Sequence, residues 1–101
     1  MIQELNDKNF DTKIKNGLKL VEFYTDWCGF CKKQRPVIED LSKKGIWIGT
    51  LNAEDYKNIT EKYNITGFPS FVLFKNGEII SKLSGFHDKS SLITKLMENV
   101  K

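Results

Sequence analysis

Two cysteines, Cys28 and Cys31, lie three positions apart within the segment YTDWCGFCKKQRP, and the 101-residue chain has no other cysteine. A thiol pair at this spacing can bind a metal ion, form a structural cross-link or exchange electrons as a dithiol and a disulfide. Structural zinc needs four ligands, and the single histidine, His87, is far along the chain and has no partner at ligand spacing. A cross-link closing so short a loop stabilises a fold by only about 2 kcal/mol. Redox chemistry is therefore the favoured interpretation.

The position of the pair supports redox chemistry. Residues 18–25 (LKLVEFYT) predict a buried strand, and residues 31–45 predict a helix closed by a glycine, so Cys28 lies at the start of that helix. Free backbone N–H groups and the helix dipole stabilise a thiolate there, and the thiolate is the nucleophile. Cys31 lies one turn into the helix and is expected to be the less exposed thiol. This arrangement predicts an outer attacking thiol and an inner resolving thiol.

The elements that position the pair follow from periodicity and turn residues. Residues 46–52 predict a second strand, which completes a βαβ unit with parallel strands. Asn76–Gly77 predicts a hairpin between two strands within residues 70–85. A first helix, capped by Asn6 or Asp7, is expected to include Phe10 and Ile14, and a short helix is expected at residues 54–64. A last helix follows Asp88, with apolar residues at helical spacing: Leu92, Ile93, Leu96, Met97 and Val100. A short additional strand is expected at residues 2–5. We expect one α/β domain over residues 1–101, with a mixed sheet of four to five strands and helices on both faces.

Composition and charge exclude several classes of function. The net charge is +3 without a block of like charges, so nucleic-acid binding is not expected. The chain contains neither an apolar stretch near the roughly 18 residues of a membrane span nor an N-terminal signal pattern. A start at Met1 predicts a cytoplasmic protein, which we expect to be a monomer. In such a reducing compartment a lone cysteine pair is more often catalytic or metal-binding than structural. Lys32 and Lys33 add positive charge close to the cysteines, and they also form a solvated helix face.

Three segments, VEFYTDWCGFCKKQRP, ITGFPSF and LSGFHDKSSL, together resemble the thioredoxin family in order and spacing over nearly the whole chain. The resemblance implies the thioredoxin fold and a protein-disulfide reductase, in which Cys28 attacks a target disulfide and Cys31 resolves the mixed disulfide. It implies no bound cofactor, disulfide-containing protein substrates and a donor of the thioredoxin-reductase type, an NADPH-dependent flavoprotein. The alternatives are a more oxidising isomerase or oxidant, a reductase dedicated to one partner, and a non-catalytic binding module on the same fold.

The resemblance also implies roles for single residues. Glu22, an acid among apolar strand residues, matches a buried family acid that accepts the proton of Cys31. The family acid is normally Asp, so the reach of the longer Glu is an open point, and a strand-end charge that reaches solvent is the alternative. Thr50 replaces a Lys common in thioredoxins, which should raise the pKa of Glu22 further. Pro69 matches the family cis-proline beside the cysteines, and Trp27 matches an aromatic residue that flanks the site.

A substrate-binding surface is expected on the loops that border the cysteines in the family. It comprises Trp27, Gly29, Phe30, Phe68, Pro69, Gly85 and Phe86. Phe30 is also a departure, because thioredoxins usually have Pro at this position. Unlike Pro, Phe keeps a backbone N–H at the helix start that can stabilise the reduced thiolate. The pair is therefore expected to be more oxidising than the family norm.

Overall fold

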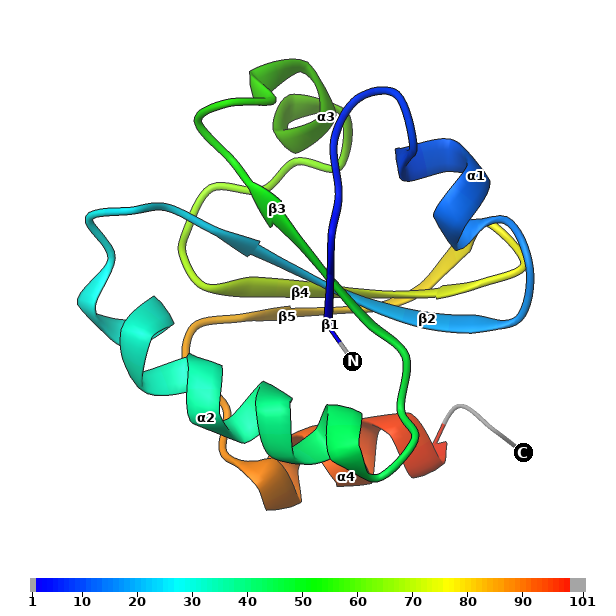
Figure 1. Cartoon of the computed structure of the whole chain (residues 1–101), viewed down its shortest axis with the longest axis vertical. Coiled ribbons are helices and arrows are strands. Elements are labelled where there is room, and N and C mark those ends of the chain that lie inside the picture. Colours follow the sequence, from blue (N-terminus) through cyan, green and yellow to red (C-terminus); the bar gives the residue numbers. More distant parts are fainter. Residues whose placement is uncertain (1, 99–101) are drawn as a thin grey trace.

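Five strands form one mixed sheet within residues 2–98, the part of the chain that the computed structural model describes (Figure 1). In spatial order they are β1 (Ile2–Glu4), β3 (Ile48–Asn52), β2 (Leu18–Tyr24), β4 (Ser70–Lys75) and β5 (Glu78–Ser84). The first three run parallel, β4 is antiparallel to β2, and β5 is antiparallel to β4. The strand that leads to the cysteines, β2, is thus the central strand of the sheet.

Helices cover both faces of this sheet (Figure 1). α2 (Gly29–Lys43) and α4 (Lys89–Glu98) pack on one face, and α1 (Phe10–Ile14) and α3 (Lys57–Lys62) pack on the other. The predicted fold class, a mixed sheet of four to five strands with helices on both faces, is confirmed. The βαβ unit made by β2, α2 and β3 is also as predicted.

Side-chain alternation along β2 decides which residues reach the cysteine face. Val21 and Phe23 belong to the core under α1 and α3, while Leu20 belongs to the core under α2 and α4. Glu22, two residues after Leu20, therefore points to the α2 face. Full burial of each apolar side chain in these two cores stabilises the fold by roughly 1.5–3 kcal/mol, enough to hold one carboxyl group in a buried position.

Several helix bounds differ from those predicted. α2 begins at Gly29, earlier than residue 31, because Cys28 is its N-cap and the Cys28 sulfur accepts a hydrogen bond from the Cys31 N–H at 3.1 Å. α1 begins only at Phe10, because the Asn6 side chain caps a preceding turn by accepting from the N–H groups of Lys8 and Asn9. In α4, Met97 is exposed rather than part of the apolar face, and Val100 lies outside the described residues.

The third helix and the second predicted strand are shorter than expected. α3 covers residues 57–62 of the predicted 54–64, because the Asn52 side chain accepts from the N–H groups of Glu54 and Asp55 and holds a turn there. β3 begins at Ile48 rather than at residue 46. The hairpin is as predicted: Asn76 and Gly77 both have positive φ, 52° and 87°, as a tight two-residue turn requires.

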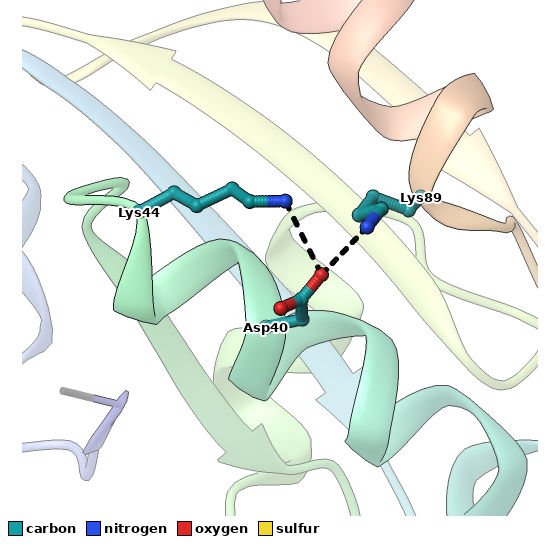
Figure 2. A network of polar contacts seen from close by, with 3 residues as sticks. All are labelled: Asp40, Lys44 and Lys89. Atoms are coloured by element: carbon teal, nitrogen blue, oxygen red, sulfur yellow. Dashed lines mark hydrogen bonds and ion pairs between the residues drawn. The ribbon is translucent and has the colours of Figure 1, made fainter.

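Asp40 links the two helices that cover the cysteine face (Figure 2). Its carboxylate accepts from Lys89 Nζ on α4 at 2.8 Å and from Lys44 Nζ at the end of α2 at 3.4 Å. The hydrogen bond from Lys89 holds the pKa of Asp40 below its usual value. Because all three side chains are exposed to solvent, these ion pairs contribute little to the free energy of unfolding.

Candidate active site

Cys28 and Cys31 form a disulfide at the junction of the central strand and α2, with their Cα atoms 5.2 Å apart. Cys28 has extended backbone angles, φ −86° and ψ 112°, and α2 starts at the next residue. The predicted difference in exposure is not seen, because Cys28 is 6% and Cys31 8% exposed. Both cysteines of the disulfide are buried, so exposure does not distinguish an outer sulfur from an inner one. The positional difference, one cysteine before the helix and one inside its first turn, is as predicted.

The start of α2 carries a field that favours a thiolate. Its first turn contains no acidic residue, so the positive end of the helix dipole is not neutralised there. Lys32 lines the cavity next to Cys31. Lys33 lies over the Phe86 ring, with Nζ 5.2 Å from the ring centroid, so its charge is directed towards that aromatic side chain. Of the two lysines, Lys32 is the one that shares a cavity with a cysteine.

Glu22 is buried beneath the helix that carries the cysteines. Its exposed fraction is 2%, so the alternative of a strand-end charge in solvent is wrong. No donor within residues 2–98 is bonded to Oε2. Burial raises the pKa of Glu22 to about 7, with the Arg35 guanidinium opposing this rise and the Glu4 carboxylate adding to it. A group with this pKa can both take up and release a proton near neutral pH.

A cavity of about 230 Å³ joins Glu22 to Cys31. Arg35 and Lys32 from α2 and Thr25 and Asp26 from the loop after β2 contribute to its walls. Its size is sufficient for water. The longer Glu22 side chain therefore reaches the cavity that Cys31 also lines. A cavity of this kind can pass a proton directly or through a water molecule.

Pro69 follows a cis peptide bond from Phe68, the geometry that the resemblance implied. The Pro69 carbonyl accepts from the Gly85 N–H at 2.7 Å, which brings the loop after β5 beside it. Gly85 has φ +82°, a conformation that favours glycine. The loop before β4 and the loop after β5 are thus joined by their backbones.

The comparisons with known proteins agree with this geometry. The family model described as thioredoxin matches residues 1–98. Thioredoxin from Chlamydia caviae is 36% identical over 95 residues, which are 92% of this chain and 93% of the relative. Thioredoxin from Staphylococcus epidermidis is 36% identical over 96 residues, 90% of each chain.

The chain belongs to the thioredoxin family. A solved structure, a mutant thioredoxin from Halobacterium salinarum, has a TM-score of 0.90 and covers 99% of this chain and 91% of its own, at 24% identity; it shows the fold. The chain is a thiol–disulfide oxidoreductase with thioredoxin-like protein-disulfide reductase function, and the isomerase, oxidant and binding-module alternatives are not favoured. Proteins of this family need no bound cofactor and act on disulfide substrates with a reductase as donor. No helix formed by residues 2–98 is long and apolar enough to cross a membrane.

The four aromatic residues of the predicted substrate-binding surface fall into two groups. Trp27 and Phe68 pack edge to face, with ring centroids 6.3 Å apart, and Trp27 is 68% exposed. Phe30, 61% exposed, extends from the first turn of α2, and Phe86 lies against Lys33. Within the described chain no ring contact joins Phe30 or Phe86 to the Trp27–Phe68 pair. The structure therefore brings two of the four predicted aromatic residues into direct contact.

Thr50 occupies the place of the family lysine but binds a different acid. It pairs in register with Glu22 on one side and with Glu4 on the other. Its hydroxyl donates to Glu4 at 2.9 Å, and the Tyr24 hydroxyl donates to the other Glu4 oxygen at 2.8 Å. Sequence reasoning missed Glu4 and Tyr24, and it missed Arg35 as the cation that acts on Glu22. Hence the charge near Glu22 comes from α2 and β1, not from position 50.

Gln34 is a further residue that sequence reasoning missed. It is fully buried on α2, its amide donates to the His87 carbonyl at 2.8 Å, and its oxygen accepts from the His87 N–H at 2.9 Å. These two bonds fix the loop that carries Phe86 to the second turn of the active-site helix. His87, predicted to be an ordinary surface residue, is instead the backbone partner in this clamp and places its ring near Ser91 and Ser84.

We predict that Gln34→Met lowers the free energy of unfolding by about 2 kcal/mol, because it leaves the His87 N–H and C=O without partners. Urea unfolding of the disulfide form measures this loss. Glu39→Met on the exposed side of α2 is the matched control, with an expected change within about 0.5 kcal/mol. Equal unfolding midpoints for the two variants would show that the clamp does not stabilise the fold.

Proposed function

We propose that Cys28, Glu22 and Cys31 carry out protein-disulfide reduction, acting in that order. The observation that carries the proposal is the placement of both cysteines at the start of α2, with Glu22 and Cys31 on one cavity. The Cys28 thiolate is supported by the helix N-terminus, whose first turn contains no acid. Cys31 lies where its proton can reach the buried carboxylate.

The reaction balances as a two-electron exchange. The Cys28 thiolate attacks one sulfur of the target disulfide, forming a mixed disulfide and releasing the other target sulfur as a thiolate that takes a proton from solvent. Glu22 accepts the proton of Cys31, and the Cys31 thiolate then attacks the Cys28 sulfur. The Cys28–Cys31 disulfide forms, and the second target sulfur leaves and is protonated. The dithiol is oxidised and the target is reduced.

We also propose that the loops around the cysteines bind an extended segment of the protein substrate. Trp27, Phe30, Phe68 and Phe86 supply apolar contacts, and Gly29, Pro69 and Gly85 leave the backbone accessible. Within the described chain neither the N–H nor the C=O of Phe68 has a backbone partner, so both are available to pair with a substrate strand. The surface favours a polypeptide over a small disulfide.

Phe30→Ala tests this surface. We expect the rate with a protein disulfide to fall several-fold, about 1–2 kcal/mol of lost contact, while the rate with a small aromatic disulfide changes little. Parallel assays with insulin and a small disulfide measure the ratio. The exposed Met97→Ala on α4 is the control for loss of a large apolar side chain elsewhere. An equal loss on both substrates would contradict a role of Phe30 in substrate binding.

Phe30→Pro tests the poise of the pair. Pro removes one N–H from the start of α2, and a charge-assisted hydrogen bond contributes about 1.5–3 kcal/mol to the reduced thiolate. The reduction potential of the variant is therefore expected to be roughly 30–60 mV more negative. A glutathione redox titration gives the value. A potential that is unchanged or less negative would contradict the stabilisation of the thiolate by this N–H.

The proposed electron donor is an NADPH-dependent flavoprotein of the thioredoxin-reductase type, and the proposed setting is the cytoplasm, with residues 1–101 acting as one monomeric domain. A reducing compartment fits a cysteine pair that works as a reductant, because the pair is there returned to the dithiol form. Insulin reduction driven by NADPH and thioredoxin reductase tests the donor. Activity that requires both components supports the proposal, whereas activity with glutathione alone contradicts it.

A further inference from the structure

We propose that Arg35 is a positioning residue for the exchange reaction: from the wall of the Glu22–Cys31 cavity, its guanidinium holds Glu22 in the form that accepts the Cys31 proton. The inference rests on the proposed function, because it presupposes that Glu22 is the proton acceptor. It adds a residue of α2 that lies one turn after Cys31 and lines the same cavity. It also adds Glu39 as a competitor for the same cation.

Arg35 is associated with two carboxyl groups, one through a shared cavity and one through a direct ion pair. Arg35 lines the cavity that also holds Glu22 and Cys31. Arg35 Nε also donates to Glu39 Oε2 at 3.2 Å, one turn further along α2. Glu22 is 2% exposed, whereas about half of the Arg35 and Glu39 side chains is exposed. The guanidinium is thus hydrogen-bonded to an exposed acid, while Arg35 shares a cavity with a buried acid whose Oε2 has no hydrogen-bonded donor among residues 2–98.

Arg35 is the cation that acts on Glu22. The neighbouring strand β3 does not stabilise the Glu22 carboxylate through Thr50, because the Thr50 hydroxyl donates to Glu4 rather than to Glu22. Among the charges around Glu22, Arg35 lowers its pKa and Glu4 raises it. The ionisable groups that face Glu22 or its cavity come from every element packed there: Cys31, Lys32 and Arg35 on α2, Glu4 on β1, Tyr24 on β2 and Asp26 in the loop after it. Tyr24 is bound to Glu4, and Asp26 accepts from Asn52, so both have partners outside the cavity.

Competition between Glu39 and Glu22 for the Arg35 charge predicts opposite effects of removing Glu39 and of removing Arg35. When Glu39 binds the guanidinium, part of its charge is compensated at the surface and less acts on Glu22. Loss of the Glu39 charge should therefore favour ionised Glu22, and loss of the Arg35 charge should disfavour it. A resolving step that needs ionised Glu22 becomes slower below neutral pH in the second case, because the fraction able to accept the Cys31 proton is smaller.

The test follows the Glu22 titration directly. Carbon-13 labelling of glutamate carboxyl groups reports the Glu22 midpoint by NMR in the disulfide form, where the cysteines do not titrate. Arg35→Gln is expected to raise this midpoint by roughly 0.5 pH, Arg35→Lys to keep it near wild type, and Glu39→Gln to lower it. Lys43→Gln, two turns further along α2, removes the same charge without facing the cavity and is the matched control with no expected change. An unmoved midpoint in Arg35→Gln, or an equal shift in Lys43→Gln, would overturn the proposal.

A kinetic measurement then separates this proposal from the one on Glu22. The pH profile of single-turnover reduction of a small disulfide should shift upwards in Arg35→Gln by the same amount, with a rate roughly two- to threefold lower at pH 6.5 and equal to wild type at pH 9. A shifted NMR midpoint with an unshifted rate profile overturns Arg35 as a positioning residue. If Glu22→Gln also leaves the profile unchanged, the error is the assignment of Glu22 as base. If Glu22→Gln changes the profile, that assignment holds and only the role of Arg35 fails.

Discussion

Cys31→Ser is expected to turn the reductase into a covalent trap for its protein substrates. Cys28 retains its place at the cap of α2 and can still attack a disulfide. The mixed disulfide then persists, because the thiol that would break it is absent. Turnover in insulin reduction should fall by roughly a thousandfold or more, the scale on which removal of an essential reacting group acts. Non-reducing gels and intact mass should show an adduct of one protein chain with one substrate chain.

Cys28→Ser is the matched control for this trap. It removes the Cys28 sulfur and leaves Cys31, which lies inside the first turn of α2 and borders the Glu22 cavity. We expect loss of turnover of the same order without accumulation of an adduct. If Cys28→Ser forms the adduct and Cys31→Ser does not, the roles of the two cysteines are the reverse of those proposed. Both serine variants lack the disulfide seen here, so each is compared with reduced wild type.

Local signals predicted most of the fold around the cysteines. The apolar run of β2, the helix pattern after Cys31 and the Asn76–Gly77 turn each depend on residues close in sequence, and each lies as expected. The start of α2 was placed too late for a physical reason. A cysteine sulfur caps this helix where Ser, Thr, Asp or Asn is the usual signal, so the sequence pattern showed no cap before Cys31.

The residues that set the charge of the site and the position of its last loop could not be predicted from such local patterns. Glu4 acts through a three-residue edge strand whose pairing with β3 brings it into one row with Thr50 and Glu22. Gln34 looks like an ordinary polar residue of a helix until the loop after β5 folds against it. Arg35 lines the Glu22 cavity only because α2 packs on the face of the sheet to which Glu22 points. All three depend on contacts between segments far apart in sequence, which no local pattern encodes.

Glu22→Gln is expected to stabilise the folded disulfide form at pH 8 while it slows reduction. The pKa of Glu22 is raised in the fold from 4.5 to about 7, so between these values the native protein binds more protons than the unfolded chain. Wild-type stability must then fall as pH rises through this window. The difference of 2.5 between the two pKa values, at 1.36 kcal/mol for each pKa unit, lowers the free energy of unfolding of the wild type by about 3 kcal/mol above pH 7. Gln resembles the protonated acid and is free of this cost.

Urea unfolding of the disulfide form at pH 4 and pH 8 tests the sign as well as the size. At pH 4 both side chains are neutral and the two proteins should unfold alike; at pH 8 the variant should be more stable by about 3 kcal/mol. Glu61→Gln on the opposite face, where the carboxyl group is exposed, should show no such pH-dependent gain. If Glu22→Gln and wild type are equally stable at both pH values, the Glu22 carboxyl group is exposed to water in solution. A gain in stability at pH 8 together with slower resolution of the mixed disulfide is what a buried base predicts, because the ionised form that destabilises the fold is the form that takes the Cys31 proton.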